Sequence, residues 1–264
     1  MSNALEKIIA DKKSNIEKYK KSFTIEDLKK KISSYKNYLN FKDKLNQNKV
    51  SVVAEIKKAS PSAGVIVEDY DPRSVAKEYL NSGADCLSVL TEENYFKGKL
   101  EDITEIKKEI KLPILCKDFF IESYQVYLAR SFGADAILII LSAVSEKTAR
   151  EIYDVAEELN MNTIVEVHTS EEAKNALSFK NAIIGINNRN LKTLKTDIQT
   201  TYDLHKVVSN HPGPLICESG IKSEKEVEEI VKKTKINNFL IGESLLKDLG
   251  KNSSLLSKIL QIKA

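Results

Sequence analysis

The chain has 264 residues, with 41 lysines and arginines against 38 aspartates and glutamates, so its formal net charge is +3. This length fits one large α/β domain or two small ones, and 42% hydrophobic residues can bury a substantial core, which excludes a disordered chain. No apolar run is long enough to cross a bilayer, no secretory signal is visible, and the lysines are interleaved with glutamates. We therefore expect a soluble cytoplasmic protein that binds neither membranes nor nucleic acid.

The cysteine count limits the redox and metal chemistry. Cys86, Cys116 and Cys217 are odd in number and form no CxxC pair, which argues against a disulfide framework and a structural zinc site. No set of histidines, cysteines and carboxylates has metal-ligand spacing. We expect no metal and no organic cofactor, and we expect the cysteines to pack in strands as small apolar residues.

The first fifty residues have a helical pattern. Leu5 and Ile8 lie on one apolar face, and Thr24 with Asp27 reads as a capping box that opens a second helix extending to Leu39. The pattern then changes to short apolar runs that alternate with amphipathic stretches, as in a parallel sheet with crossover helices. There are eight such runs: Val50–Ile56, Cys86–Leu90, Ile114–Cys116, Ala136–Leu141, Thr163–Val167, Ala182–Ile186, Leu215–Cys217 and Phe239–Ile241.

Helix boundaries between these runs carry their own signals. Asp71-Pro72 starts one helix with proline at its first position, and Gly83 ends it, as Gly133 ends another. Two further capping boxes are expected at Thr169/Glu172 and Ser223/Glu226.

Eight βα units predict a closed (β/α)8 TIM barrel. We expect one domain over 1–264, in which 1–48 is an N-terminal helical extension that closes over the barrel mouth, 49–250 the barrel and 251–264 a C-terminal helix. A doubly wound open sheet is the alternative, but no GxGxxG or GxxxxGK[ST] motif follows any of the apolar runs.

Polar residues gather where the expected strands end, which is where TIM barrels carry their chemistry. Glu55 and Lys57 share the strand face of Val53, so all three point into the barrel if Val53 does. One such pair could be a structural ion pair, but burying several charges without a function is costly. The whole set favours an active site: Glu55, Lys57, Lys117, Glu166, Asn187 and Glu218.

Two neighbours of this set are expected to be structural. Asp118 could aim Lys117, but we favour a cap of the following helix. His168 stands directly before the capping Thr169, so we expect a structural role for it rather than that of a base.

The last two units predict an anion site. Gly220 follows Glu218-Ser219, and Gly242 follows the eighth run. Glycine lets the backbone approach an anion, and main-chain N–H groups ahead of a helix can cradle a phosphate. Glu243 would contribute its backbone N–H there. Either glycine alone could be an ordinary turn residue, but the pair predicts a phosphorylated substrate.

The segment Val52-Val-Ala-Glu-Ile-Lys-Lys-Ala-Ser-Pro-Ser62 resembles the signature of the indole-3-glycerol-phosphate synthase family. The similarity covers nearly the whole chain and continues through six further segments: Ser88–Glu92, Cys116–Phe119, Val165–His168, Gly185–Leu191, Glu218–Gly220 and Ile241–Leu245.

The resemblance implies ring closure of 1-(2-carboxyphenylamino)-1-deoxyribulose 5-phosphate, with loss of carbon dioxide and water. Lys117 would be the general acid, Glu166 the base of the dehydration, and Lys57 the group that binds the carboxylate, positioned by Glu55. The other residues carried over by resemblance fall into three groups: Asn187 and Glu218 in catalysis, Ser60, Phe96, Arg189 and Ser219 in substrate binding, and Gly220, Ile221, Gly242 and Glu243 in phosphate binding. Phe119 could join the apolar wall around the anthranilate ring or pack beneath a loop.

Three other functions stay open. A Schiff-base aldolase would use Lys57 or Lys117 as a nucleophile on a sugar phosphate. The isomerase that makes this substrate is a related barrel, but it needs no such pair of lysines. A barrel retained only as a scaffold would have no use for Lys117. As partners we expect the small phosphorylated anthranilate-sugar substrate, and we expect a monomer or a weak homodimer.

Overall fold

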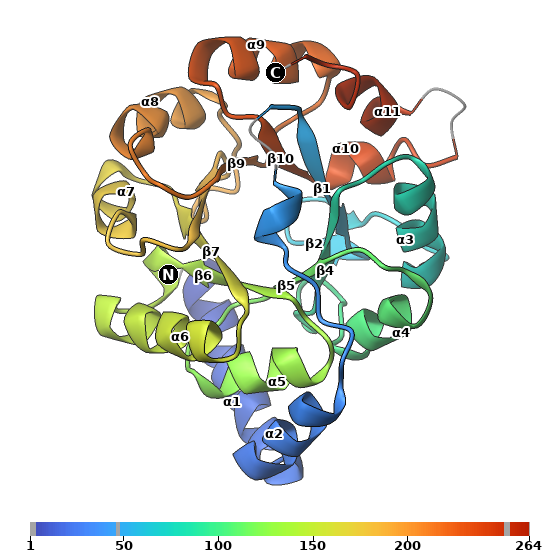
Figure 1. Ribbon diagram of the computed structural model, residues 1–264, viewed down its shortest axis with the longest axis vertical. Helices are drawn as coiled ribbons and strands as arrows, with labels where there is room; N and C mark the ends of the chain where they lie inside the picture. Colours follow the sequence, from blue (N-terminus) through green and yellow to red (C-terminus); the bar gives the residue numbers. More distant parts are fainter. Residues whose placement is uncertain (1–3, 46–47, 251–253, 264) are drawn as a thin grey trace.

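A computed structural model describes residues 4–45, 48–250 and 254–263. Within these ranges eight parallel strands close into one barrel, in which each strand pairs with the next along the chain and the last pairs with the first (Figure 1). The strands are β1 (Ser51–Ile56), β4 (Cys86–Leu90), β5 (Ile114–Lys117), β6 (Ala136–Ile140), β7 (Asn162–Val167), β8 (Ile183–Asn187), β9 (Leu215–Glu218) and β10 (Asn238–Ile241). The predicted TIM barrel is confirmed, and every expected run is a strand.

Helices cover the outside of the barrel (Figure 1). They are α3 (Pro72–Asn81), α4 (Glu101–Glu109), α5 (Tyr124–Ser131), α6 (Glu146–Glu158), α7 (Ser170–Ala176), α8 (Gln199–Val208), α9 (Glu224–Thr234), α10 (Glu243–Leu246) and α11 (Leu255–Ile259). Asp71 caps α3, and the glycines expected to end two helices have positive φ, 92° at Gly83 and 102° at Gly133. Of the expected C-terminal helix, α11 is described, whereas 251–253 and 264 lie outside the described residues.

Two smaller features lie between these elements. A hairpin, β2 (Ala59–Ser60) with β3 (Gly64–Val65), follows β1, and short 3-10 turns lie at Lys42–Lys44 and Leu141–Ala143.

The strands are largely apolar because both of their faces are buried. Val52 and Ala54 pack outward against the helices, whereas Val53, Leu115 and Ile164 fill the barrel interior. The three cysteines are buried in β4, β5 and β9, as expected. Because side chains alternate along a strand, the inward positions beyond this interior layer carry the charged residues of the predicted set.

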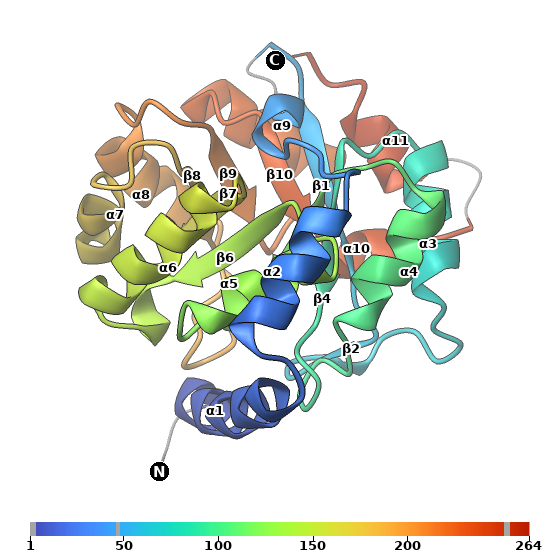
Figure 2. The same cartoon turned by 60° about the horizontal axis from the view of Figure 1, so that its bottom comes forward.

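The N-terminal arm runs along the barrel from one end to the other. Figure 2 shows α1 (Ala4–Ser22) lying across the end near β2, with α2 (Ile25–Ser34) against the side. The capping box of Thr24 is confirmed, but α2 ends at Ser34 and does not reach Leu39. The Leu39 N–H instead donates to Asp135 (2.8 Å), and the fully buried Phe41 joins the barrel interior. None of the helices within the described ranges has the length and apolarity that a bilayer crossing requires.

Candidate active site

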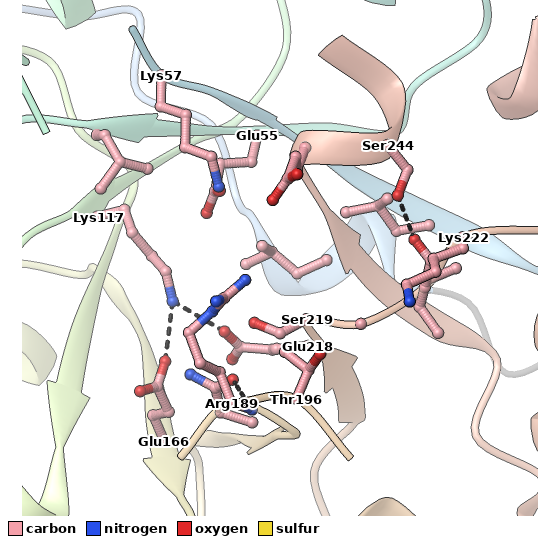
Figure 3. Close-up of a pocket in the computed structure, with 18 of the residues that line it drawn as sticks. Glu55, Lys57, Lys117, Glu166, Arg189, Thr196, Glu218, Ser219, Lys222 and Ser244 are labelled. Carbon is pink, nitrogen blue, oxygen red and sulfur yellow. Dashed lines mark hydrogen bonds and ion pairs between the residues drawn. The ribbon is translucent and has the colours of Figure 1, made fainter. Parts of the chain in front are cut away.

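A pocket of about 590 Å³ opens at the carboxyl ends of the strands. Figure 3 shows acidic and basic side chains from several strands pointing into it. All six residues predicted to be catalytic line this pocket: Glu55, Lys57, Lys117, Glu166, Asn187 and Glu218.

Lys117, at the end of β5, is the centre of the charged group. Its Nζ donates to Glu166 Oε2 (2.9 Å) and to Glu218 Oε2 (2.8 Å), as Figure 3 shows. Burial would lower the pKa of Lys117, but the two carboxylates and Glu55 outweigh burial and raise it. The lysine is therefore a cation at neutral pH, held between two carboxylates in the pocket.

The two carboxylates beside Lys117 have unequal environments. Burial would raise the pKa of Glu166, but Lys117 and His168 lower it well below its usual range. The pKa of Glu218 is raised to about 7. Burial raises it most and the neighbouring Glu166 adds to this, and together they outweigh Lys117, which lowers it. Paired titratable groups whose pKa values are pushed apart are typical of acid–base sites.

Gly185 in β8 sets the position of Glu218. A Cβ at Gly185 would lie 2.0 Å from Glu218 Oε1, so only glycine leaves room for this carboxylate. Among the described residues that oxygen has no hydrogen-bond partner. The sequence reasoning did not single out Gly185 for this contact, although a glycine inside a buried strand is a known sign of close approach.

Lys57 and Glu55 form an ion pair at the end of β1, as the resemblance implies. Gly242 lies directly behind it, since a Cβ there would stand 2.4 Å from Glu55 Oε1 and 3.0 Å from Lys57 Nζ. The ion pair and the glycine expected to bind phosphate are thus packed against each other.

The glycine-bearing turns form another part of the pocket wall. Ser219 and Gly220 both have positive φ, 66° and 84°, directly after β9, and Gly242 is the N-cap residue of α10. A left-handed serine costs on the order of 1 kcal/mol or more, and such strain clusters at functional sites. Ile221 and Glu243 also line the pocket, and the Glu243 carboxylate pairs with Lys247.

An apolar wall faces the charged residues. Phe96 and Phe119 both line the pocket, with ring centroids 6.4 Å apart, alongside Leu138, Ile140 and Leu191. Phe119 lines the pocket and is also buried in the core cluster against which Phe96 packs, so both possibilities for it stay open.

The remaining predicted binding residues, Arg189 and Ser60, follow the ends of β8 and β1. Arg189 lines the pocket and its Nη1 donates to Ser62 Oγ (3.1 Å) and to the Leu194 carbonyl (3.0 Å), which joins two loops. Asn187 Oδ1 accepts the Arg189 N–H (2.9 Å). Ser60 stands apart: it accepts from the Ala63 N–H within its hairpin and lies outside the pocket lining, so its substrate contact stays a prediction.

Asp118 does not cap the helix that follows it. The next helix, α5, begins at Tyr124, whereas Asp118 forms a buried ion pair with Lys12 of α1 (2.7 Å) and accepts from Thr91 Oγ1 (2.7 Å). The prediction of a cap is wrong because a distant cation from the N-terminal helix reaches this carboxylate.

Comparison with known proteins shows which family the chain resembles. The model of the family described as "Indole-3-glycerol phosphate synthase" matches residues 5–255. The chain belongs to the indole-3-glycerol phosphate synthase family. A relative of that name from Prochlorococcus marinus (strain MIT 9515) is 42% identical over 253 residues, covering 93% of this chain and 85% of the relative. Another from Endomicrobium trichonymphae is 40% identical over 245 residues, covering 92% and 94%.

Solved structures with similar folds are more distant in sequence. A mutant tryptophan synthase alpha-subunit from Pyrococcus furiosus aligns with a TM-score of 0.58 at 15% identity, covering 81% of this chain and 96% of that one. A phosphoribosylanthranilate isomerase from Thermotoga maritima aligns with a TM-score of 0.54 at 13% identity, covering 80% and 97%. These structures share the barrel fold with this family member.

The sequence reasoning missed three lysines that line the pocket of this family member: Lys222, Lys247 and Lys258. Lys222 follows Ile221 directly, and Lys247 lies one turn along from Glu243, so their closeness to the glycine turns was a usable signal. Lys258 reaches the pocket from α11, far along the chain from any predicted strand end, and no local pattern marks it.

Proposed function

We propose that this pocket catalyses the synthesis of indole-3-glycerol phosphate from 1-(2-carboxyphenylamino)-1-deoxyribulose 5-phosphate, as a carboxy-lyase that also releases water. The observation that carries the proposal is the Lys117 ammonium, held between Glu166 and Glu218 on the floor of a deep pocket. Membership of the family supports the same reaction.

The first step is attack of the ring carbon that bears the carboxylate on the ketone carbon of the sugar. Lys117 donates its proton to the ketone oxygen, which becomes a hydroxyl. A cation already oriented by two buried carboxylates needs no reorganisation as negative charge develops on that oxygen. The new carbon–carbon bond closes the five-membered ring.

Carbon dioxide then leaves with its bonding electrons returned to the ring, which restores the aromatic system. In the last step the hydroxyl takes up a second proton and leaves as water. Glu166 removes a proton from the methylene carbon beside the nitrogen of the new five-membered ring, which completes the indole. The low pKa of Glu166 keeps this carboxylate ionised and able to accept the proton.

The rest of the pocket orients the substrate. Lys57, paired with Glu55, binds the substrate carboxylate before it is lost, while Phe96 and Phe119 contact the aromatic ring. The main chain at Gly220 and Gly242 binds the phosphate, as helix-adjacent turns after the last strands of such barrels do.

A Schiff-base aldolase fits this site less well. An amine must be neutral to attack a carbonyl, and the raised pKa of Lys117 keeps it protonated. Borohydride treatment in the presence of a sugar phosphate should therefore leave no covalent adduct, and an adduct on Lys117 or Lys57 would favour the aldolase instead.

The direct test supplies the proposed substrate to the purified protein without added metal and follows indole fluorescence. The parent should produce it and a folded Lys117→Ala variant should not. A silent parent that is fully folded would overturn the proposed function, and an active Lys117→Ala variant would remove Lys117 from its role.

A further inference from the structure

His168 extends the charged group in a direction that the proposed reaction does not use. It stands two residues beyond Glu166, on the same side of the chain as it leaves β7. Its Nε2 lies 3.2 Å from Glu166 Oε1, and its Nδ1 lies 3.3 Å from Glu172 Oε2. The imidazole is therefore enclosed between two carboxylates, with only 10% of its side chain exposed.

Glu172 is fixed in place by the start of α7. Thr169 Oγ1 accepts the Glu172 N–H (3.2 Å), as predicted, but the carboxylate does not complete a capping box with Thr169. The Glu172 carboxylate accepts the backbone N–H of His168 (2.7 Å) and also contacts Nδ1 of the His168 ring. The Glu172 side chain, which would complete a capping box, thus points toward the imidazole and contacts it on the side opposite Glu166.

The two oxygens of Glu166 consequently have different partners. Oε2 accepts from Lys117, and Oε1 faces His168. The charged groups form one continuous series from the edge of α7 to the pocket floor: Glu172, His168, Glu166, Lys117 and Glu218. Glu218, by contrast, forms an ion pair only with Lys117 within the described part of the chain, and its second oxygen lies against Gly185.

The charge on the imidazole follows from these neighbours. Burial lowers the pKa of His168, but Glu166 of β7 and Glu172 of α7 outweigh it and raise the pKa to about 9. The ring is therefore an imidazolium at neutral pH, and it adds a second cation to the surroundings of Glu166 that Glu218 lacks.

We propose, on the basis of the proposed function, that His168 is a positioning residue for Glu166. As an imidazolium clamped by Glu172, it holds one oxygen of Glu166, keeps the carboxylate ionised and turns the other oxygen toward Lys117. It thereby decides which of the two carboxylates beside Lys117 acts as the base. His168 does not touch the substrate, and its effect is transmitted through Glu166.

The kinetic test replaces His168 by glutamine, which is polar and similar in size but carries no charge. In His168→Gln we expect kcat to fall about tenfold at pH 7, with KM changed less than about twofold, since the loss falls on a catalytic group rather than on binding. The acid limb of the kcat profile should move to higher pH, because Glu166 has lost a cation. His205→Gln is the matched control: His205 lies on α8, away from the pocket lining, and its replacement should leave the profile unchanged.

An unchanged acid limb in His168→Gln would overturn the proposal. A lower melting temperature alone would not support it, because loss of a purely structural histidine reduces the amount of folded enzyme without moving the pKa of a catalytic group. A fall in kcat with a shifted limb and an unaltered His205→Gln would support it.

A second measurement needs no turnover. The chain has 3 histidines, so their imidazole nitrogen resonances can be assigned by substitution and titrated in the intact protein. His168 should titrate near pH 9, and its pKa should fall toward the ordinary value in Glu166→Gln and Glu172→Gln. Titration near 6.5 in the parent would overturn the proposal. A parent with the expected titration but no indole product would refute the reaction while supporting the His168–Glu166 ion pair.

Discussion

Replacing Gly185 by alanine tests how tightly the fold positions the Glu218 carboxylate beside Lys117. The added Cβ would lie 2.0 Å from Glu218 Oε1 and 2.9 Å from Ile164 Cγ2. Because non-bonded atoms need well over 3 Å, the carboxylate must retreat by about 1 Å or more. Its other oxygen is 2.8 Å from Lys117 Nζ, so this retreat breaks or reorients that contact. A displacement of about 1 Å in a catalytic group costs on the order of 100-fold in rate.

We therefore expect kcat of Gly185→Ala to fall by about 100-fold, with a loss of about 1–3 kcal/mol in stability from overpacking. Gly213→Ala is the matched control, because its Cβ would lie 2.2 Å from the Ala182 carbonyl, ahead of β9 and outside the pocket lining. Both variants are melted by circular dichroism and assayed by indole fluorescence per folded molecule. A kcat for Gly185→Ala within about threefold of the parent, or an equal loss in Gly213→Ala, would refute the reasoning.

Three further changes test other parts of the molecule. Lys12→Met leaves the buried Asp118 without its cation, which should cost about 3 kcal/mol of unfolding free energy and release α1 to earlier proteolysis; an unchanged melting temperature would contradict this. Gly242→Asp places a carboxylate in the proposed phosphate site and its Cβ 2.4 Å from Glu55 Oε1, so KM should rise at least about tenfold. An unaltered KM would remove Gly242 from phosphate binding. Burial raises the pKa of Asp102 to about 6. The folded state therefore binds a proton on the Asp102 carboxyl more tightly than the unfolded chain does, and the free energy of unfolding falls as pH rises through about 6. Asp102→Asn should therefore raise the unfolding free energy by up to about 3 kcal/mol at pH 8 and by little at pH 4, and an equal gain at both would contradict the assignment.

The barrel was predictable because its local signals agree with its packing. Each strand is buried on both faces and therefore largely apolar, and the helices between them begin and end at residues with a clear conformational preference, such as Asp71 and Gly83. The end of α2 was not predictable in this way. The apolar period continues to Leu39, but the N–H of Leu39 donates to Asp135, a residue 96 positions along the chain, and no local pattern contains this contact.

The site likewise combines contacts that a local pattern predicts with contacts to residues distant in the sequence. Strand parity placed Lys117, Glu166 and Glu218 on one inward face, and the structure brings these three side chains into contact. What parity cannot give is the partner that arrives from elsewhere: Lys12 reaches Asp118 from α1. Glu172 forms half of its predicted cap, and its carboxylate instead accepts the backbone N–H of His168 (2.7 Å) and contacts the His168 ring (3.3 Å).

The N-terminal arm has a consequence for how the chain reaches its folded state. Phe41 is buried in the barrel interior and its N–H donates to Asn162, while Lys20 pairs with Glu122. These partners emerge from the ribosome long after the arm does, and β1 completes the barrel only when β10 has been made. The arm must wait with its apolar face exposed, and contacts so distant in sequence form slowly. Synthesis thus makes the arm before the residues that it packs against, so its apolar face is exposed in the emerging chain until those residues follow.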